Sequence, residues 1–191
     1  MLAEYQITLA PQTLENASAG AKPVLEKALA QVGFIPNMYA RMVNSPGLLD
    51  TYLNGYAAFR SQSGFSSVEQ EVVFLSISRE NGCEYCVSAH SFLADMKSGV
   101  PADVTNAIRD DSPIPDARLQ ALAAFTRTLV AARGLPTKGD VAPFLAAGYE
   151  ERHILEIVLA ISVKTLSNYA NHLFHTPLDP MFEGRRWSDP A

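Results

Sequence analysis

Two cysteines, a histidine and a glutamate lie close together in the first half of the chain. Cys83 and Cys86 are three positions apart, and His90 follows four positions after the second cysteine. Glu71 precedes Cys83 by twelve positions. Residues three and four apart share a face of a helix, so both thiols and the imidazole would line one face. Together these groups suffice for a dithiol redox site, in which a base stands beside a thiol that has a partner thiol in reach.

The expected helix start at this pair favours a reactive thiolate. Asn81-Gly82 interrupts the preceding helix and places Cys83 in the first turn of the next, where unpaired N–H groups and the helix dipole favour an anion. His90, with an ordinary pKa near ~6.5, is suited to take the proton of Cys86. The dipole therefore favours Cys83 as the more acidic thiol, whereas the histidine favours Cys86. We expect Cys86 to attack, because its base is within reach.

Glu71 is the candidate to orient His90 and relay its proton. It lies in an apolar helix and shares a face with Leu75 and Ser78, which would bury the carboxylate and raise its pKa. Periodicity alone also allows a solvated residue in the first turn of that helix with a favourable dipole contact.

Two further histidines have a spacing that could hold a metal. His172 and His175 are three apart on an expected helix, but no cysteine or carboxylate lies close to them there. We interpret them as polar packing or an oligomer contact, and Asn168, on the face of His172, would approach the dithiol if the helices pack together. Zinc at the cysteine pair would need ligands that the sequence does not offer nearby. No metal and no cofactor is expected.

The spacing of apolar residues predicts an all-α protein. They recur at three and four positions or fill whole turns, and no period-2 alternation is sustained. Glycines follow several of the periodic segments, as at helix ends, and Ser66 with Glu69 has capping-box spacing. We expect helices at 24–32, 48–63, 67–80, 83–98, 101–109, 116–133, 141–147 and 150 to about 174, with an irregular tail at 177–191.

A weak internal repeat appears at a shift of 84 positions. Five identities in 22 positions allow either a duplication or two buried helices of similar composition. In a duplication, Ser167 and Ala170 stand where the first copy has its cysteines, so one copy would be active. The shift aligns identical residues: Gly64 with Gly148, Leu75 with Leu159, Ile77-Ser78 with Ile161-Ser162, and Tyr85 with Tyr169.

Length and composition narrow the class of protein. A chain of 191 residues allows one substantial core, so we expect a single domain over 1–191, with its core at about 25–182. A hydrophobic share of 48% with 18% charged residues is typical of a globular protein, and a net charge of −5 argues against nucleic acid as a partner. No transmembrane helix and no signal peptide are expected, which makes the cytoplasm the default location. A closely spaced cysteine pair in a reducing compartment indicates redox chemistry or metal binding.

The segment from Glu71 through Cys83-Glu-Tyr-Cys86 to His90 resembles the signature of AhpD-like alkyl hydroperoxidases in the carboxymuconolactone decarboxylase superfamily. The resemblance covers roughly residues 25–182. Three flanking segments resemble peroxidase-related members of that group: Gly33-Phe-Ile-Pro-Asn-Met38, Ser45-Pro-Gly-Leu-Leu49 and Asn168-Tyr-Ala-Asn-His172.

This resemblance implies an AhpD-like all-helical fold with an internal two-helix repeat, and a homo-oligomer. By the roles of that family, Cys86 would attack the peroxide, Cys83 would resolve it as a disulfide, and Glu71 with His90 would relay the proton. Some members are reduced by a lipoamide-like dithiol or work with a peroxiredoxin. The best-characterised members have a second histidine where this chain has Tyr85, which would reroute or weaken the relay; Tyr85 would donate to Glu71 or simply pack.

The function expected from these residues is a thiol-dependent peroxidase or disulfide reductase, an antioxidant oxidoreductase with a hydroperoxide as acceptor. One alternative is a cofactor-free decarboxylase of the carboxymuconolactone type, which needs acid and base groups but no dithiol. Another is a non-enzymatic oligomer whose assembly senses redox state through the disulfide.

Overall fold

The computed structural model describes residues 2–189, and each regular element in that range is helical, which confirms the predicted all-α class. A π turn, η1 (Ala94–Ser98), continues α5, and a 3-10 helix, η2 (Pro180–Arg185), follows α9. The α-helices are α1 (Lys22–Val32), α2 (Asn37–Met42), α3 (Pro46–Gln62), α4 (Ser67–Glu80), α5 (Glu84–Leu93), α6 (Ala102–Arg109), α7 (Ala117–Ala131), α8 (Lys138–Ala146) and α9 (Glu151–Phe174).

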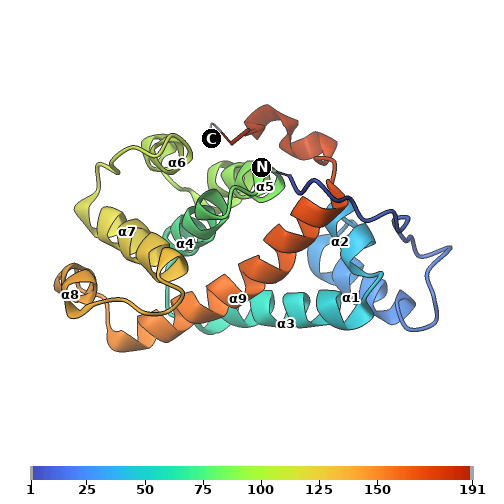
Figure 1. The fold of residues 1–191 in the computed structure, drawn as a ribbon, viewed down its shortest axis with the longest axis horizontal. Helices are drawn as coiled ribbons and strands as arrows, with labels where there is room; N and C mark the ends of the chain where they lie inside the picture. Colours follow the sequence, from blue (N-terminus) through green and yellow to red (C-terminus); the bar gives the residue numbers. More distant parts are fainter. Residues whose placement is uncertain (1, 190–191) are drawn as a thin grey trace.

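Helices α4 and α5 lie in the middle of the molecule, and the long α9 runs past them from α8 to the C-terminal segment (Figure 1). Helix α4 packs against α7, α5 and α9, and α9 packs along α3. Helices α1 and α2 lie at one end of the molecule and α6 to α8 at the other (Figure 1). The two helices that hold Glu71 and the cysteines are therefore enclosed by the others.

The junction between α4 and α5 positions the cysteines. Helix α4 begins at a capping box between Ser66 and Glu69, as the sequence predicts. It ends in a Schellman motif: Gly82 has a φ of 64°, its N–H donates to the carbonyl of Arg79, and the N–H of Cys83 donates to the carbonyl of Ser78. Cys83 is thereby the N-cap of α5 rather than a residue of its first turn.

The shift of 84 positions found in the sequence matches two helix starts in the structure. Helices α4 and α9 begin at Ser67 and Glu151, which are 84 positions apart. Each is preceded by a glycine with positive φ, Gly64 at 77° and Gly148 at 89°, a backbone conformation that other residues rarely adopt. The two helices differ in length. Helix α4 ends at the Schellman motif after 14 residues, whereas α9 has 24 residues.

The expected irregular tail is wrong for residues 180–185, which form η2, and holds for 177–179 and 186–189, which have no regular structure but are held by long-range contacts. After the turns of η2, the indole of Trp187 is buried, and its Nε1–H donates to the carbonyl of Arg109 at 3.1 Å. The backbone N–H of Trp187 donates to Ser88 Oγ on α5 at 2.9 Å. These long-range contacts hold a segment that has no periodicity of its own. Helix α2 was also not predicted, because it is only six residues long.

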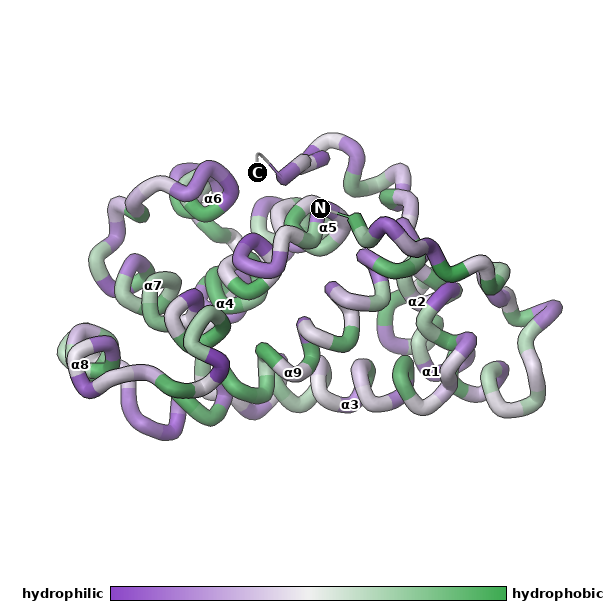
Figure 2. The backbone as a smooth tube through the Cα atoms, in the orientation of Figure 1, coloured by the Kyte–Doolittle hydropathy of each residue, from purple (hydrophilic) through white to green (hydrophobic). Residues whose placement is uncertain are grey.

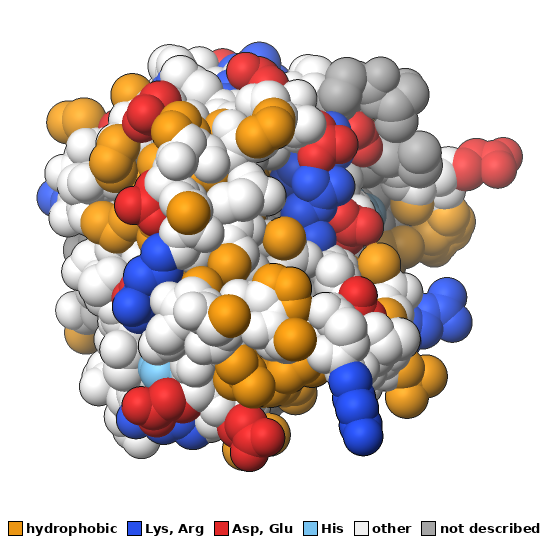
Figure 3. Space-filling model, turned by 90° about the vertical axis from the view of Figure 1, so that its left-hand side faces the viewer, with side chains coloured by type: hydrophobic (Ala, Val, Ile, Leu, Met, Phe, Trp, Pro, Cys, Tyr) orange, Lys and Arg blue, Asp and Glu red, His pale blue; other side chains and the backbone are white. Residues whose placement is uncertain are grey.

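Hydrophobic and hydrophilic positions alternate along the helices, as expected of elements that bury one face (Figure 2). Buried apolar residues from α1 to α9 form one connected core. On the face that includes α7 and α8, hydrophobic side chains lie among acidic and basic ones (Figure 3). Within residues 2–189, no helix is long and apolar enough to span a membrane.

The close approach of α3 and α9 depends on Gly55. A Cβ atom at Gly55 would lie 2.8 Å from Val163 Cγ2, whereas a Cβ atom at Gly47, on the same helix, would meet nothing within 4 Å. Valine is stiff at χ1, so the helices would have to move apart.

We therefore expect Gly55→Ala to lower the free energy of unfolding by roughly 1–3 kcal/mol. Gly47→Ala, the control in the first turn of the same helix, should change it by less than about 0.5 kcal/mol, because the preference for alanine over glycine applies mainly to helix interiors. Urea unfolding of both variants measures the difference. Equal effects at the two positions would show that the helices do not touch at Gly55.

Candidate active site

Both thiols are buried at the amino end of α5, and neither forms a disulfide in the structure. Cys86 is the third residue of α5, where the helix dipole favours an anion. Asn171 on α9 points its amide at the pair: Nδ2 lies 3.3 Å from Cys86 Sγ and 3.9 Å from Cys83 Sγ. Helix α9, the second copy of the repeat, therefore contributes directly to the dithiol site.

The two thiols differ in acidity. Burial alone would raise the pKa of Cys86, but a hydrogen bond from Cys83, the ammonium of Lys164 and the amides of Asn171 and Asn168 together lower that pKa to about 5. Burial, and then the hydrogen bond to Cys86, raise the pKa of Cys83 well above its ordinary value. The dipole argument taken alone favours Cys83, but desolvation raises the pKa of both thiols, and the hydrogen bond between them lowers the pKa of Cys86 and raises that of Cys83. The geometry favours Cys86 as the thiolate.

The ammonium of Lys164 is a positive charge that lowers the pKa of Cys86. Lys164 was not among the residues that the sequence singled out. It lies on α9 and is 1% exposed. Its Nζ stands 5.6 Å from the centre of the Phe74 ring, and no carboxylate of residues 2–189 forms an ion pair with it. A buried ammonium without a carboxylate partner is costly, and a thiolate nearby offsets part of that cost.

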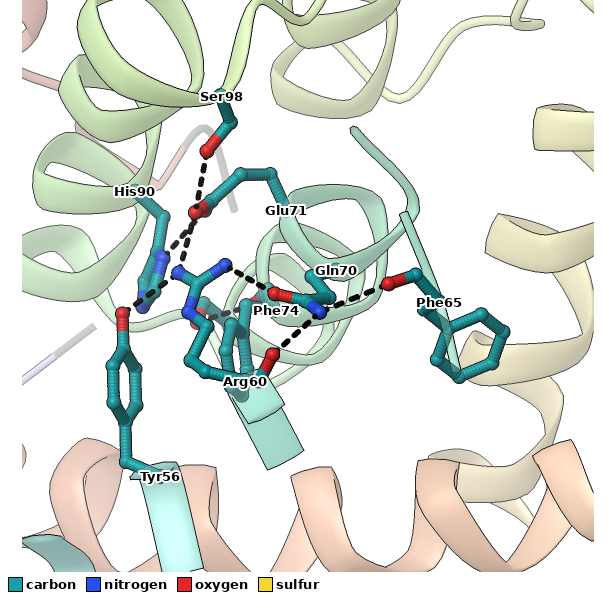
Figure 4. Close-up of polar contacts among 9 residues, drawn as sticks. Tyr56, Arg60, Phe65, Gln70, Glu71, Phe74, His90 and Ser98 are labelled. Atoms are coloured by element: carbon teal, nitrogen blue, oxygen red, sulfur yellow. Dashed lines mark hydrogen bonds and ion pairs between the residues drawn. The ribbon is translucent and has the colours of Figure 1, made fainter. Parts of the chain in front are cut away.

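Glu71 and His90 form the contact that their spacing suggested (Figure 4). Glu71 is 1% exposed, and its Oε2 lies 2.8 Å from His90 Nδ1. The other carboxylate oxygen accepts from Arg60 Nη2 at 2.5 Å and from Ser98 Oγ at 3.3 Å. Glu71 is therefore a buried residue with a full set of partners, not a solvated one.

The charge state of this network differs from the expected one. Burial raises the pKa of Glu71, but His90 and Arg60 outweigh it and leave the pKa below its ordinary value, so the predicted rise is wrong. Burial, followed by the charge of Lys164, lowers the pKa of His90 to about 4. A neutral imidazole beside an ionised carboxylate donates through Nδ1–H, which leaves Nε2 as a proton acceptor.

Arg60 holds the carboxylate in place and is itself held. Its guanidinium donates to Tyr56 Oη at 2.7 Å and to Gln70 Oε1 at 3.1 Å (Figure 4). Gln70 Nε2 donates in turn to the carbonyl oxygens of Arg60 and Phe65. Helix α3 thus supplies the counter-charge for a carboxylate on α4, and fixed partners on every side orient Glu71 toward His90.

His90 and Cys86 share a cavity but form no hydrogen bond with each other in the structure. Both line a space of about 320 Å³, which we call the Cys86 cavity, and Lys164 lines it as well. Since the pKa of Cys86 is about 5 and that of His90 about 4, the histidine is not needed to remove the thiol proton. Six of the other lining residues are aromatic: Phe34, Tyr39, Tyr52, Tyr56, Tyr85 and Phe182.

Tyr85 packs in the core, as one of the two expectations has it, and does not donate to Glu71. Its hydroxyl donates not to Glu71 but to the carboxylate of Asp179, which also accepts from the backbone N–H of Asn37 at 3.1 Å. The ring lies 6.2 Å from that of Phe182, edge to face. Tyr85 therefore ties α5 to the C-terminal segment and forms part of the cavity wall, and it takes no part in the Glu71–His90 network.

The other histidines lie apart from that network. His175 caps α9 with a φ of 49°, and its Nε2 lies 2.7 Å from the carbonyl oxygen of Ala3. His172 lines a second cavity, which also contains Cys83. Among residues 2–189, no group of three or more histidine, cysteine or acidic side chains is arranged to hold a metal ion.

No protein-family model and no curated protein matches the chain. Several solved structures match the chain. An uncharacterized peroxidase-related protein from Ralstonia eutropha JMP134, described as an alkylhydroperoxidase AhpD core, has a TM-score of 0.78 at 18% identity over 91% of this chain and 93% of its own. A peroxidase-related protein from Silicibacter sp. TM1040 has a TM-score of 0.72 at 19% identity over 94% and 97%.

A cysteine-to-alanine variant of the debrominase Bmp8, in complex with 2,3,4-tribromopyrrole, has a TM-score of 0.75 at 17% identity over 94% of this chain and 96% of its own. At these identities the likeness establishes the fold and leaves the reaction open. The chain therefore folds as an AhpD-like all-helical domain, the fold that its resemblance to that group implies.

Proposed function

We propose that the protein is a thiol-dependent peroxidase that reduces organic hydroperoxides at Cys86 with Cys83 as the resolving thiol. The observation that supports this most is the contrast between the thiols: Cys86 has a pKa of about 5, lines a cavity, and has a second thiol in hydrogen-bonding contact. Thiolate is the form of cysteine that attacks peroxides, and a neighbouring thiol converts the product into a disulfide.

The first half of the reaction consumes the peroxide. The Cys86 thiolate attacks the terminal oxygen of ROOH, an S–O bond forms, the O–O bond breaks, and the alkoxide RO⁻ takes a proton to leave as ROH. Lys164 and His90 line the same cavity and are suited to hold or pass that proton. Cys83 then attacks the sulfenic acid, losing its proton, and the S–S bond forms as water leaves.

Reduction of the disulfide by an external dithiol completes the cycle. The sum is one hydroperoxide and two thiol hydrogens converted to an alcohol and water. The raised pKa of Cys83 means that its proton leaves only as the sulfur attacks, and it departs with the hydroxyl of the sulfenic acid as water; the Glu71–His90 pair is proposed to relay it. Decarboxylation of a lactone needs no such pair of thiols, and no feature of the site favours it.

A second candidate is reductive removal of bromine from an aromatic compound. The aromatic walls of the Cys86 cavity favour a flat apolar ligand, and the structural neighbour Bmp8 is a debrominase. In this reaction the thiolate takes the halogen, the ring carbon takes a proton, and Cys83 displaces bromide to form the same disulfide. Turnover of tert-butyl hydroperoxide against turnover of a bromopyrrole, each with dithiothreitol, distinguishes the two candidates.

Substitution of each cysteine should block a different step of the reaction. Cys86→Ser should abolish hydroperoxide reduction, because the attacking sulfur is lost. Cys83→Ser should still react once with peroxide and accumulate a sulfenic acid, which dimedone traps for mass spectrometry. Undiminished turnover in Cys86→Ser, or trapping on Cys83 instead, would contradict the assigned order of the thiols.

Lys164→Met should make Cys86 less acidic, since it removes a buried positive charge while keeping the side chain's length. The wild-type thiol is ionised above about pH 5. A higher pKa of Cys86 in the variant leaves less thiolate at a pH just above 5. We expect alkylation of Cys86 by iodoacetamide at about pH 6 to slow roughly tenfold. Lys22→Met, at an exposed lysine, is the control and should change nothing. An unchanged rate in Lys164→Met would mean that the ammonium does not act on the sulfur.

A further inference from the structure

The Cys86 cavity contains a positively charged proton donor. Among the described residues that line it, Lys164 is the only lysine or arginine. Its side chain is 1% exposed, and it forms no ion pair with a carboxylate of residues 2–189. The ammonium lowers the pKa of Cys86 in the same cavity, so the thiolate is its counter-charge. A reaction that consumes the thiolate leaves this ammonium unpaired.

We propose that Lys164 gives its proton to the leaving alkoxide when Cys86 attacks a hydroperoxide. This inference rests on the proposed peroxidase function and assigns one of its proton transfers to a particular residue. As the S–O bond forms and the O–O bond breaks, the electron pair of that bond stays on RO⁻, which takes the ammonium proton. The products are a sulfenic acid on Cys86, the alcohol ROH and a neutral amine on Lys164.

The rest of the cycle returns the proton. The external dithiol that reduces the disulfide supplies two protons, of which one stays on Cys83. The other reaches Lys164, because the Cys86 thiol that reduction restores ionises again beside the amine. The protein thus returns to its starting state, a thiolate beside an ammonium.

This transfer removes two buried charges in one step. Before it, the cavity holds a thiolate and an ammonium; after it, both the sulfenic acid and the amine are neutral. An ammonium that kept its proton would be a buried charge without a partner, which is costly in an apolar environment. Loss of the proton to the alkoxide avoids that cost at the moment when the alkoxide forms.

His90 lines the same cavity but has no proton to give in this step. Its Nδ1 lies 2.8 Å from the ionised carboxylate of Glu71, which accepts the one N–H of a neutral imidazole. Burial and then the charge of Lys164 lower the pKa of His90 to about 4, so Nε2 carries no proton at neutral pH. His90 is therefore suited to accept a proton in the cavity, whereas Lys164 is suited to donate one.

The phenols of the cavity are poorer acids for this step. A tyrosine that protonated the alkoxide would become a buried phenolate, so it would create a charge where Lys164 loses one. The hydroxyl of Tyr85 already donates to Asp179, and that of Tyr56 accepts from Arg60. Burial raises the pKa of all four lining tyrosines: Tyr39, Tyr52, Tyr56 and Tyr85.

The choice of leaving group separates this role from the effect of Lys164 on the acidity of Cys86. tert-Butyl hydroperoxide expels an alkoxide, which needs a proton, whereas peracetic acid expels acetate, which does not. The rate of thiol loss with each oxidant is measured at about pH 7 by quenching with N-ethylmaleimide and mass spectrometry. Each rate is divided by the rate at which iodoacetamide alkylates Cys86, which corrects for the fraction of thiolate. Lys164→Met is compared with the wild type and with Lys22→Met, at an exposed lysine.

We expect Lys164→Met to slow the corrected reaction with tert-butyl hydroperoxide about 100-fold or more and to leave that with peracetic acid unchanged. Lys22→Met should change neither. Lys164→Arg keeps a positive charge that does not release its proton, so it should show the same selective loss, and it serves if Lys164→Met does not fold.

Equal slowing with both oxidants, or no slowing of the corrected rates with either, would overturn the proposal, because Lys164 would then act on the thiolate alone. A wild-type protein that reacts with peracetic acid and iodoacetamide but not with tert-butyl hydroperoxide would instead overturn the proposed function, and this inference with it.

Discussion

The site depends on one buried electrostatic interaction, that of the Lys164 ammonium with the Cys86 thiol. Lys164 is 1% exposed and has no carboxylate partner among the described residues. The Cys86 thiolate is the negative charge that stabilises its ammonium. Burial would otherwise keep this thiol protonated, as it does Cys83. The same charge opposes protonation of His90. Lys164 on α9 thereby acts together with the hydrogen bond from Cys83 to lower the pKa of Cys86, and together with burial to keep the imidazole of His90 neutral.

A second ion pair, Glu71 with Arg60, lies beside the first and fixes the position of His90. His90 and Arg60 together hold the pKa of this buried carboxylate below its ordinary value, so that Glu71 stays ionised and orients His90. The two pairs come from four different helices, α3, α4, α5 and α9, which explains why the helix crossing at Gly55 matters to the site as well as to the core. Stability and chemistry depend on the same packing.

The local features of the fold could be predicted from the sequence, and the long-range ones could not. Helix α4 has its predicted bounds because its capping box and its terminal glycine are local signals. Cys83, Cys86 and His90 could be selected because their spacing is helical, and Glu71 because it shares a face of an apolar helix with Leu75 and Ser78. Lys164 had a signal too, since it ends an apolar run, but its nearness to Cys86 depends on how α9 crosses α5. The ordered C-terminal segment was missed because Trp187 is held by partners far away in sequence.

The acidity of the thiols in the unmodified, fully reduced protein tests the central claim most directly. Ultraviolet absorbance of the thiolates, recorded as a function of pH, resolves how the pair titrates. If the buried ammonium acts as described, one thiol ionises with an apparent pKa of about 5 and the other stays protonated well above the ordinary thiol range. Two thiols that both ionise near the ordinary value of ~8.5 would contradict it.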